Sequence, residues 1–444
     1  MRSLIVRDSV RRNARIPLAA LSLGILASLS PSSARAQATA PAPAAKPAAG
    51  PAIGGAGEEQ VWIDLAAPIE GLVQKIPVGM VEVSGSTGAG RSRFHDVAIV
   101  VDLSTSTRLP SGVDVNGNGK VGKSAPEIRE DYWGDGSPEK LCDDDGDTIA
   151  AAEIAAVRRL LKLLDPTHTR VALVAFGDKG ELVAPLDSTR AQLSAALDVL
   201  DHKHGWYGGT NYAEAIEVAI GALESAKPVG KTERKRSILF LSDGYPTMPQ
   251  PEPLPAKSAI AAAKHAAAVG AHLHSFALGP EAVRGRDILA VMSKLADGSL
   301  TEIDRPGDVL FHLPSVELSE VAELHIDNDT THQEGRAVRL LADGTFDGFA
   351  PLQPGRNVLH VTAVGIGGGR QEEHRDVVYD PAAGTAKDVE LEVSRLRELL
   401  RERTVEVELG QEIQRAREAR RARQKELQIH ATPQPTAPPE PTQK

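Results

Sequence analysis

The chain has 444 residues, of which 41% are hydrophobic, 25% are charged and 3% are aromatic, so we expect two or three domains with cores built from Ala, Val and Leu. The net charge of -10 argues against nucleic acid as a partner, because phosphate contacts need a basic face. Cys142 is the only cysteine, which excludes an internal disulfide.

Residues 1–36 are typical of an export signal. Several arginines precede the apolar run "IPLAALSLGILASL", and a small-residue site ends at Ala36. The run is too short to cross a bilayer as a helix, so we expect no transmembrane helix after signal removal. Residues 37–59 read as a Pro/Ala/Gly linker. We therefore expect an exported protein, located in the periplasm, at the cell surface or outside the cell, with the general and twin-arginine routes both open.

Residues 94–316 alternate short, nearly continuous apolar strands with amphipathic helices, as in "HDVAIVVDLS" and "TIAAAEIAAVRRLLKLLD". This pattern predicts an α/β fold with a doubly wound, mostly parallel sheet, Rossmann-like in arrangement. Residues 60–84 and 318–380 instead show short alternating strands and turn signals, which predict an all-β sandwich.

The C-terminal part changes character again. Residues 386–430 are highly charged and helix-prone, with Val389, Val393, Leu396 and Leu400 at coiled-coil-like spacing. This segment is expected to be either a solvated helix that packs one apolar edge on the body or a docking or membrane-surface arm. Residues 431–444 read as a disordered tail.

Oxygen-bearing side chains gather where the predicted parallel strands end. Asp102, Ser104 and Ser106 follow one strand in "DLSTS", Thr210 precedes a helix in "GGTNYAEAI", and Asp243 ends another strand in "FLSDG". In such sheets ligands bind outside the carboxyl ends of the strands. Two carboxylates and three hydroxyls form a hard-oxygen site, which favours Mg²⁺, Mn²⁺ or Ca²⁺ over zinc.

These residues resemble the metal-ion-dependent adhesion site of the von Willebrand factor type A family, whose pattern is D-x-S-x-S, then a Thr, then an Asp at a strand end. The resemblance covers about residues 94–316, and the five family positions correspond to Asp102, Ser104, Ser106, Thr210 and Asp243. It implies Mg²⁺ or Mn²⁺ at the site, with serine hydroxyls binding the ion directly and carboxylates often acting through water. It also implies an open coordination position for a partner's carboxylate.

An insertion over residues 107–147 departs from the family pattern and would lie beside the metal. Its "DVNGNGKVGKSAPE" partly matches a calcium loop, although Ala125 replaces the final Glu and Glu127 lies nearby. The possible calcium ligands offer side-chain oxygens or, for Lys120, a carbonyl: Asp114, Asn116, Asn118, Lys120, Asp143, Asp145 and Asp147. The alternative is an Asx/Gly-rich turn with solvated carboxylates.

Two further segments need an interpretation. Trp206 and Tyr207 precede Thr210 and are possible partner contacts, because aromatic residues are scarce in this chain. "GSTGAGRS" (85–92) resembles a phosphate loop, but a strand follows it instead of a helix, so we interpret 85–93 as a flexible hinge.

Residues 60–84 and 318–380 resemble the opening and remaining strands of a bacterial immunoglobulin-like domain, through "VEVSG", "DGTF" and "GRNVLHV". The resemblance implies a β-sandwich into which the α/β domain is inserted, because domains accept insertions at exposed loops. The alternative is a separate N-terminal extension followed by a complete sandwich.

These features lead to one main hypothesis and two alternatives. The main hypothesis is an exported, non-enzymatic protein that captures an acidic group of a protein or glycan through the divalent ion. The first alternative is a metal-dependent hydrolase, but no motif supplies a convincing general base. The second is a cell-envelope protein in which the metal is purely structural.

Overall fold

The computed structural model describes residues 60–75, 78–124, 141–201, 208–225 and 233–383, together with 387, 390, 394 and 395. The predicted export signal, linker and C-terminal tail lie outside the described residues, as does most of the predicted charged segment. Among the described residues, no helix is long and apolar enough to cross a membrane.

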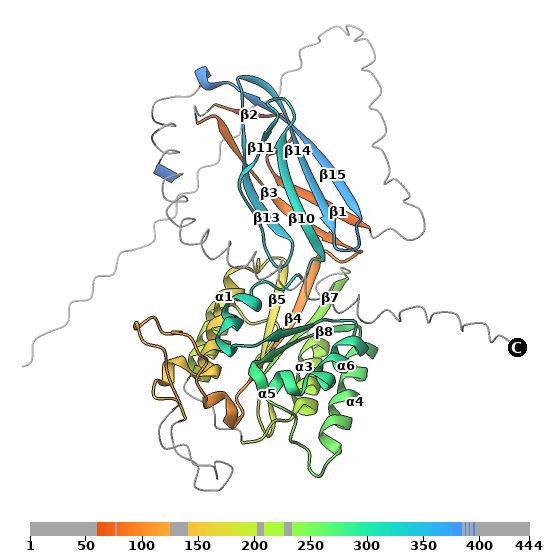
Figure 1. The fold of residues 1–444 in the computed structure, drawn as a ribbon. Coiled ribbons are helices and arrows are strands. Elements are labelled where there is room, and N and C mark those ends of the chain that lie inside the picture. Colours follow the sequence, from red (N-terminus) through yellow and green to blue (C-terminus); the bar gives the residue numbers. More distant parts are fainter. Residues whose placement is uncertain are drawn as a thin grey trace, which may run out of the picture. The chain divides into compact units, whose positions relative to one another are not determined.

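A six-stranded sheet forms the centre of the α/β part, in the order β6-β5-β4-β7-β8-β9 (Figure 1). All neighbouring strands pair in parallel except the edge pair β5 and β6. The strands are β4 (Phe94–Asp102), β5 (Thr169–Phe176), β6 (Gly180–Ala184), β7 (Arg234–Ser242), β8 (Ala271–Leu278) and β9 (Leu300–Ile303). The mixed α/β class with a mostly parallel sheet is therefore as predicted.

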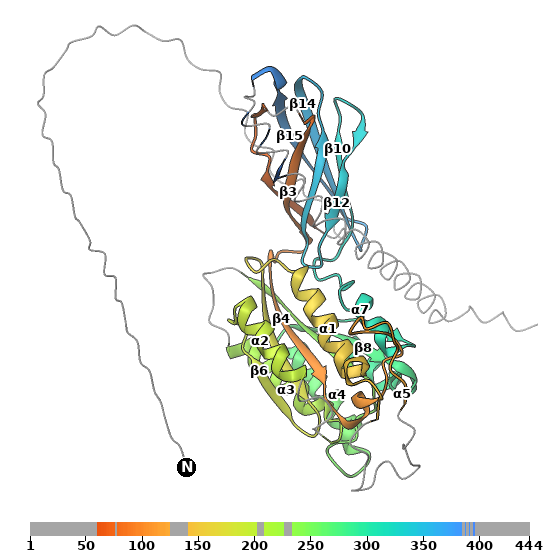
Figure 2. The ribbon, with the colours of Figure 1, turned by 90° about the vertical axis from the view of Figure 1, so that its left-hand side faces the viewer.

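Helices cover both faces of this sheet (Figure 2). Alternate residues of β4 point to opposite faces of the sheet. Val97, Ile99 and Val101 pack into an apolar cluster with α1 and α2. Ala98 and Val100 pack into a second cluster with α3, α4 and α6. The helices are α1 (Ile149–Lys162), α2 (Arg190–Asp201), α3 (Tyr212–Ser225), α4 (Leu254–Ala268), α5 (Gly279–Arg284), α6 (Arg286–Leu295) and α7 (Val309–His312). Because both faces are covered, the strand interiors are apolar throughout.

Two antiparallel-rich sheets form the all-β part, in the orders β1-β3-β13-β12 and β11-β10-β14-β15-β2. Their strands are β1 (Val61–Ala67), β2 (Leu72–Gln74), β3 (Met80–Ala89), β10 (Val321–Asn328), β11 (Gln333–Glu334), β12 (Arg336–Leu340), β13 (Thr345–Pro351), β14 (Gly355–Gly365) and β15 (Arg370–Tyr379). Apolar residues of both sheets share one core, which includes Val83, Phe346 and Val361.

Segments on either side of the α/β part in the sequence join within each of these sheets. Val81 pairs with Ala350 and Val83 with Gly348, so β3 is hydrogen-bonded to β13. In the other sheet, β2 pairs in parallel with β15. An isolated strand pair is marginal in water, so residues 61–89 and 321–379 depend on one another for this core.

The predicted hinge over 85–93 is wrong for most of its length. Residues 85–89 continue β3, which pairs with both β1 and β13, so only 90–93 connect β3 to β4. The glycines serve close packing: a Cβ at Gly88 would lie 2.7 Å from the ring of Trp62, and one at Gly85 would overlap the backbone of Asp64. A glycine-rich sequence here reflects the close approach of neighbouring groups rather than flexibility.

Candidate metal centre

Asp102 is the last residue of β4, and its side chain is fully buried. Its Oδ1 accepts a 2.8 Å hydrogen bond from the backbone N–H of Ser104, and its Oδ2 accepts a 2.6 Å hydrogen bond from the hydroxyl of Ser242. The chain then turns into a short 3-10 helix, η1 (Thr105–Arg108), in which the Thr107 hydroxyl donates to the carbonyl of Ser104. This turn fixes the serines of the predicted motif beside the carboxylate.

The remaining predicted ligands meet this turn. Ser106 Oγ donates a 2.8 Å hydrogen bond to Asp243 Oδ1 and lies 3.1 Å from Ser104 Oγ. A Cβ built on Gly244 would lie 3.6 Å from Ser106 Oγ and 3.8 Å from Thr210 Oγ1. The structure therefore brings the hydroxyls of Ser104, Ser106 and Thr210 and the carboxylates of Asp102 and Asp243 to one edge of the sheet.

Loop contacts that the sequence did not predict hold Thr210 in place. The carbonyl of Gly208 accepts hydrogen bonds from the backbone N–H and the hydroxyl of Thr105, at 3.1 and 3.0 Å. Asp178 Oδ1 accepts a 2.6 Å bond from the N–H of Gly209, and the hydroxyl of Thr247 accepts one from the N–H of Thr210. The loop after β4 and the loop before α3 are thus tied directly to each other.

The two carboxylates of the site are difficult to ionise together. Burial raises the pKa of Asp102 to about 6, although hydrogen bonds from Ser242 and Ser104 oppose the shift. Burial and then the charge of Asp102 raise the pKa of Asp243 well above its ordinary value. Two buried carboxylates so close together favour a bound cation that compensates their charge.

Glu153 is a third buried carboxyl group beside these two. It lies on α1, its Oε2 accepts a 2.9 Å hydrogen bond from the N–H of Asp102, and its Oε1 has no hydrogen-bond partner. Burial, followed by the charges of Asp102 and Asp243, raises its pKa well above the usual value. Burial therefore favours the protonated form of Glu153, and its hydrogen bond to the N–H of Asp102 supports the end of β4. The sequence feature that could have revealed Glu153 is an acidic residue within the otherwise apolar stretch "IAAAEIAA".

The donor set fits a divalent cation. Five oxygen-bearing side chains gather where β4 and β7 end and α3 begins, and none of the five is a nitrogen or sulfur ligand. Hydroxyl and carboxylate oxygens suit Mg²⁺ and Mn²⁺. Bound there, the ion would supply a positive charge and a coordination position for an incoming oxygen ligand.

The described part of the insertion forms a compact acidic turn. The N–H of Asn118 donates to side-chain oxygens of both Asp114 and Asn116, and Asp114 Oδ2 accepts from the N–H of Gly119 at 2.8 Å. The side-chain amides of Asn116 and Asn118 donate to the two carboxylate oxygens of Asp144, at 2.9 and 2.6 Å. Asp144 is not one of the seven calcium ligands expected from the sequence.

The other acidic residues of the insertion have different surroundings. Asp147 is buried and accepts backbone hydrogen bonds from Val115 and Gly122, each at 2.8 Å, so it holds the loop together. Asp143 accepts from the N–H of Lys123 at 2.6 Å, and Asp145 begins the 3-10 helix η2 (Asp145–Asp147). Lys120 follows the turn and donates its N–H to Asn118 Oδ1.

Some predicted positions lie outside the described residues. They are the possible partner contacts Trp206 and Tyr207, and residues 125–140 of the insertion, including Glu127.

One stretch of the chain matches a known protein family. Residues 136–245 match the von Willebrand factor type A domain family. The matched stretch contains Thr210 and Asp243, and it begins after the Asp102–Ser106 motif. Among curated proteins, no match to the sequence was found.

Several solved structures are similar to part of the chain. BatB from Bacteroides thetaiotaomicron is 18% identical, with 49% of this chain and 93% of that chain covered and a TM-score of 0.31. An aerotolerance-related membrane protein from Bacteroides fragilis is 17% identical, with 49% and 94% covered and a TM-score of 0.31. Proximal thread matrix protein 1 from the mussel byssus, with zinc in its adhesion motif, is 15% identical, with 52% and 47% covered and a TM-score of 0.32.

Proposed function

We propose that this is an exported, non-enzymatic binding protein that uses a divalent ion at Asp102, Ser104, Ser106, Thr210 and Asp243 to capture an acidic group of a protein or glycan partner. The observation that carries the proposal is the convergence of these five side chains at the carboxyl ends of β4 and β7. Mg²⁺ or Mn²⁺ is the proposed ion, because all the donors are hard oxygens.

The charge balance of the site supports capture of an acidic group. Two carboxylates from the protein neutralise a divalent ion only when both are ionised and close to it, and the family pattern often places water between them and the ion. A carboxylate from a partner then completes the coordination shell as a charge-assisted ligand. Burial raises the pKa of Glu153 well above its usual value, which disfavours a third negative charge beside the ion.

The binding role is favoured over hydrolysis by the position of the third carboxyl group. A hydrolase needs a general base in contact with the metal-bound water. Glu153 instead accepts a hydrogen bond from the N–H of Asp102 and is fully buried inside the fold.

We propose in addition that Ca²⁺ orders the insertion through the turn of Asp114, Asn116 and Asn118.

A pull-down tests the proposed function. The full chain without its export signal is immobilised and exposed to envelope proteins from the source cells, with Mg²⁺ or with chelator, beside an Asp243→Ala bait. The proposal expects a partner that is retained by the wild type in Mg²⁺ and released by chelator, and that Asp243→Ala fails to retain. Glu224→Ala, which changes an exposed carboxylate on α3, is the matched control. Retention of the same partner by Asp243→Ala would contradict the proposal.

A further inference from the structure

A cluster of two histidines and a carboxylate lies on the all-β part, outside the α/β part. Asp329 directly follows β10, His360 lies on β14 and His374 lies on β15. One potential ligand atom from each residue lies within 4.8 Å of the others. We propose that Asp329, His360 and His374 form a second metal site, specific for a borderline-soft divalent ion such as Zn²⁺.

The sheet register brings the two imidazoles together. His360 and His374 are direct partners in the antiparallel pair of β14 and β15. Directly opposed residues on neighbouring strands are the closest side-chain neighbours that a sheet offers, and their side chains point to the same face. The backbone pairing therefore fixes the two rings beside each other, whatever else binds there.

The two rings are stacked and nearly parallel, with an interplanar angle of 20° and a centroid separation of 4.3 Å. Neutral imidazole is the form that binds zinc. The stacked rings therefore bring two potential zinc ligands together on one face of the sheet.

Asp329 is held in place by the turn that ends β10. Its backbone N–H donates a 2.9 Å hydrogen bond to the carbonyl of Val358. The neighbouring Asn328 is fully buried, and its Oδ1 accepts from the N–H of Thr330 at 2.9 Å while its Nδ2 donates to the carbonyl of Pro351 at 2.6 Å. This turn positions Asp329 beside the histidines without a contribution from either ring.

The distances within the cluster suit a shared ion better than direct hydrogen bonds. Asp329 Oδ1 lies 3.5 Å from His360 Nδ1, and Asp329 Oδ2 lies 3.9 Å from His374 Nδ1. Nitrogen and oxygen atoms joined by a hydrogen bond are closer, at about 2.9 Å. Two ligands on one tetrahedral zinc ion with bonds of about 2.0 Å are separated by about 3.3 Å. Small side-chain rotations would therefore bring all three residues onto one ion.

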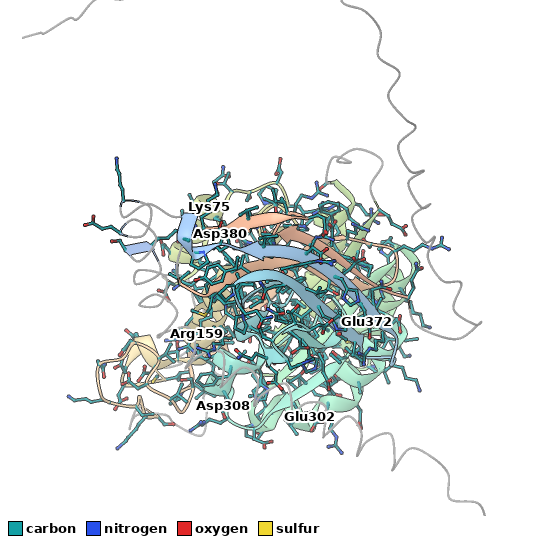
Figure 3. All side chains as sticks on the ribbon, turned by 90° about the horizontal axis from the view of Figure 1, so that it is seen from above. Lys75, Arg159, Glu302, Asp308, Glu372 and Asp380 are labelled. Carbon is teal, nitrogen blue, oxygen red and sulfur yellow. The ribbon has the colours of Figure 1, made fainter. Side chains whose placement is uncertain are left out.

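Glu372 lies beside the second nitrogen of His360. Its Oε2 is 3.5 Å from His360 Nε2, and its Oε1 accepts from Arg370 at 2.7 Å, while the Thr362 hydroxyl is 3.4 Å from the same Nε2. Figure 3 labels Glu372, whose side chain on β15 is 41% exposed. Histidines that bind a metal through one nitrogen commonly donate the other N–H to a carboxylate. Glu372 thus has the place of a residue that orients His360 and leaves Nδ1 for the ion.

The type of ion follows from the donors. Two imidazole nitrogens and one carboxylate suit Zn²⁺ and its neighbours among the transition metals, whereas the site at Asp102 and Asp243 offers oxygen ligands only. Three protein ligands leave a fourth position for water or for a donor from another molecule. The ion would also join the end of β10 to β14 and β15 within one sheet.

Zinc titration of the full chain tests the site. The protein is untagged and carries Asp243→Ala, and Mg²⁺ is present in excess. Zinc binding at the oxygen-ligand sites therefore does not contribute to the measured heat. Isothermal titration calorimetry should show one equivalent of Zn²⁺, with affinity reduced at least tenfold by either His360→Ala or His374→Ala. Glu372→Gln should bind zinc with about tenfold lower affinity. His325→Ala, which removes an exposed histidine of β10 that lies 3.6 Å from Glu323, should bind as the parent does.

Cobalt provides a second readout that does not depend on affinity alone. Co²⁺ bound by both histidines should give visible absorption bands of a four- or five-coordinate ion, and each single histidine variant should lose them. Circular dichroism of each variant checks that the sheets are intact. The proposal is overturned if the parent binds no zinc, or if His360→Ala and His374→Ala bind it as tightly as His325→Ala does.

Discussion

The hydroxyl of Ser242 donates a 2.6 Å hydrogen bond to Asp102 Oδ2, which joins the last residue of β7 to the last residue of β4 at the metal edge of the sheet. The phenol of Tyr212 lies 3.1 Å from the same hydroxyl and donates to the carbonyl of Gly244 at 2.8 Å. A buried chain of hydrogen bonds therefore orients the first carboxylate of the site. Neither Ser242 nor Tyr212 belongs to the five predicted ligands.

Ser242→Ala should weaken Mg²⁺ binding by about tenfold, because groups that orient metal ligands typically contribute ten- to a hundredfold to metal affinity. Ser237→Ala is the matched control: Ser237 is also a fully buried serine of β7, and its hydroxyl has no hydrogen-bond partner. Calorimetric Mg²⁺ titration of both variants measures the difference. Equal Mg²⁺ affinities for the two variants would show that the bond from Ser242 does not orient Asp102.

Glu153→Gln should preserve Mg²⁺ binding and stabilise the metal-free protein at neutral pH. The amide oxygen can still accept the N–H of Asp102, and glutamine has no proton to lose. Because the pKa of Glu153 is raised in the fold, its contribution to stability is complete below the unfolded pKa and declines as the pH rises. The gain in the free energy of unfolding of Glu153→Gln, measured with denaturant in chelator, should therefore increase from pH 5 to pH 8. A gain that is independent of pH would contradict a neutral Glu153.

His95 should make the protein less stable in acid. Burial, followed by the charges of Lys235 and Arg234, lowers the pKa of His95 to about 3. The unfolded chain takes up the proton near pH 6.5 and the folded chain does not, so stability is complete above about pH 6.5 and falls toward pH 3. Between pH 6.5 and pH 4 the loss attributable to this residue is about 3 kcal/mol.

Replacement of His95 by Leu measures this contribution. The free energy of unfolding of His95→Leu should fall less steeply between pH 6.5 and pH 4 than that of the wild type. His272→Gln, which alters a histidine on β8 with a partly exposed ring, should retain the wild-type slope. A wild-type slope in His95→Leu would mean that His95 is protonated in the folded protein.

Calcium should protect the insertion over residues 107–147 from proteolysis. Asp114 and Asp144 both contact the turn, Asp114 through the N–H of Asn118 and Asp144 through the side-chain amides of Asn116 and Asn118, and calcium would compensate the charge of these carboxylates. Limited proteolysis should cut the insertion quickly in chelator and slowly in millimolar Ca²⁺. Asp114→Ala should remove the protection, and equal cutting of the wild type in both conditions would leave the insertion as an acidic turn without calcium.

The sequence predicted the features that depend on periodicity and strand ends. Continuous apolar runs identified β4, β5, β7 and β8, because strands covered on both faces must be apolar throughout. Parallel strands share one carboxyl edge, so the sequence alone was enough to place Asp102 and Asp243 together. The pairing of β3 with β13 followed from two incomplete sets of alternating strands, each too short for a core.

Other features could not be predicted, because they depend on tertiary contacts. Nothing local distinguishes Ser242, which orients Asp102, from Ser237, whose hydroxyl has no partner, although both lie on β7. Asp178 supports the Thr210 loop from a distant part of the chain. A glycine-rich sequence is compatible with both flexibility and close packing. The contact between Gly88 and the ring of Trp62, which the sequence does not reveal, shows that close packing is the reason here.

The proposed metal centre is tested most directly by a Mg²⁺ titration of the full chain by isothermal calorimetry. The variant Asp243→Ala and the control Glu224→Ala are measured under the same conditions. Asp243 accepts the hydroxyl of Ser106 at the edge of the sheet, so its loss should leave the fold intact, as judged by circular dichroism. The wild type and Glu224→Ala should each bind one Mg²⁺, and Asp243→Ala should bind it with at least tenfold lower affinity. A folded Asp243→Ala variant that binds Mg²⁺ as tightly as the wild type would contradict the proposed metal centre.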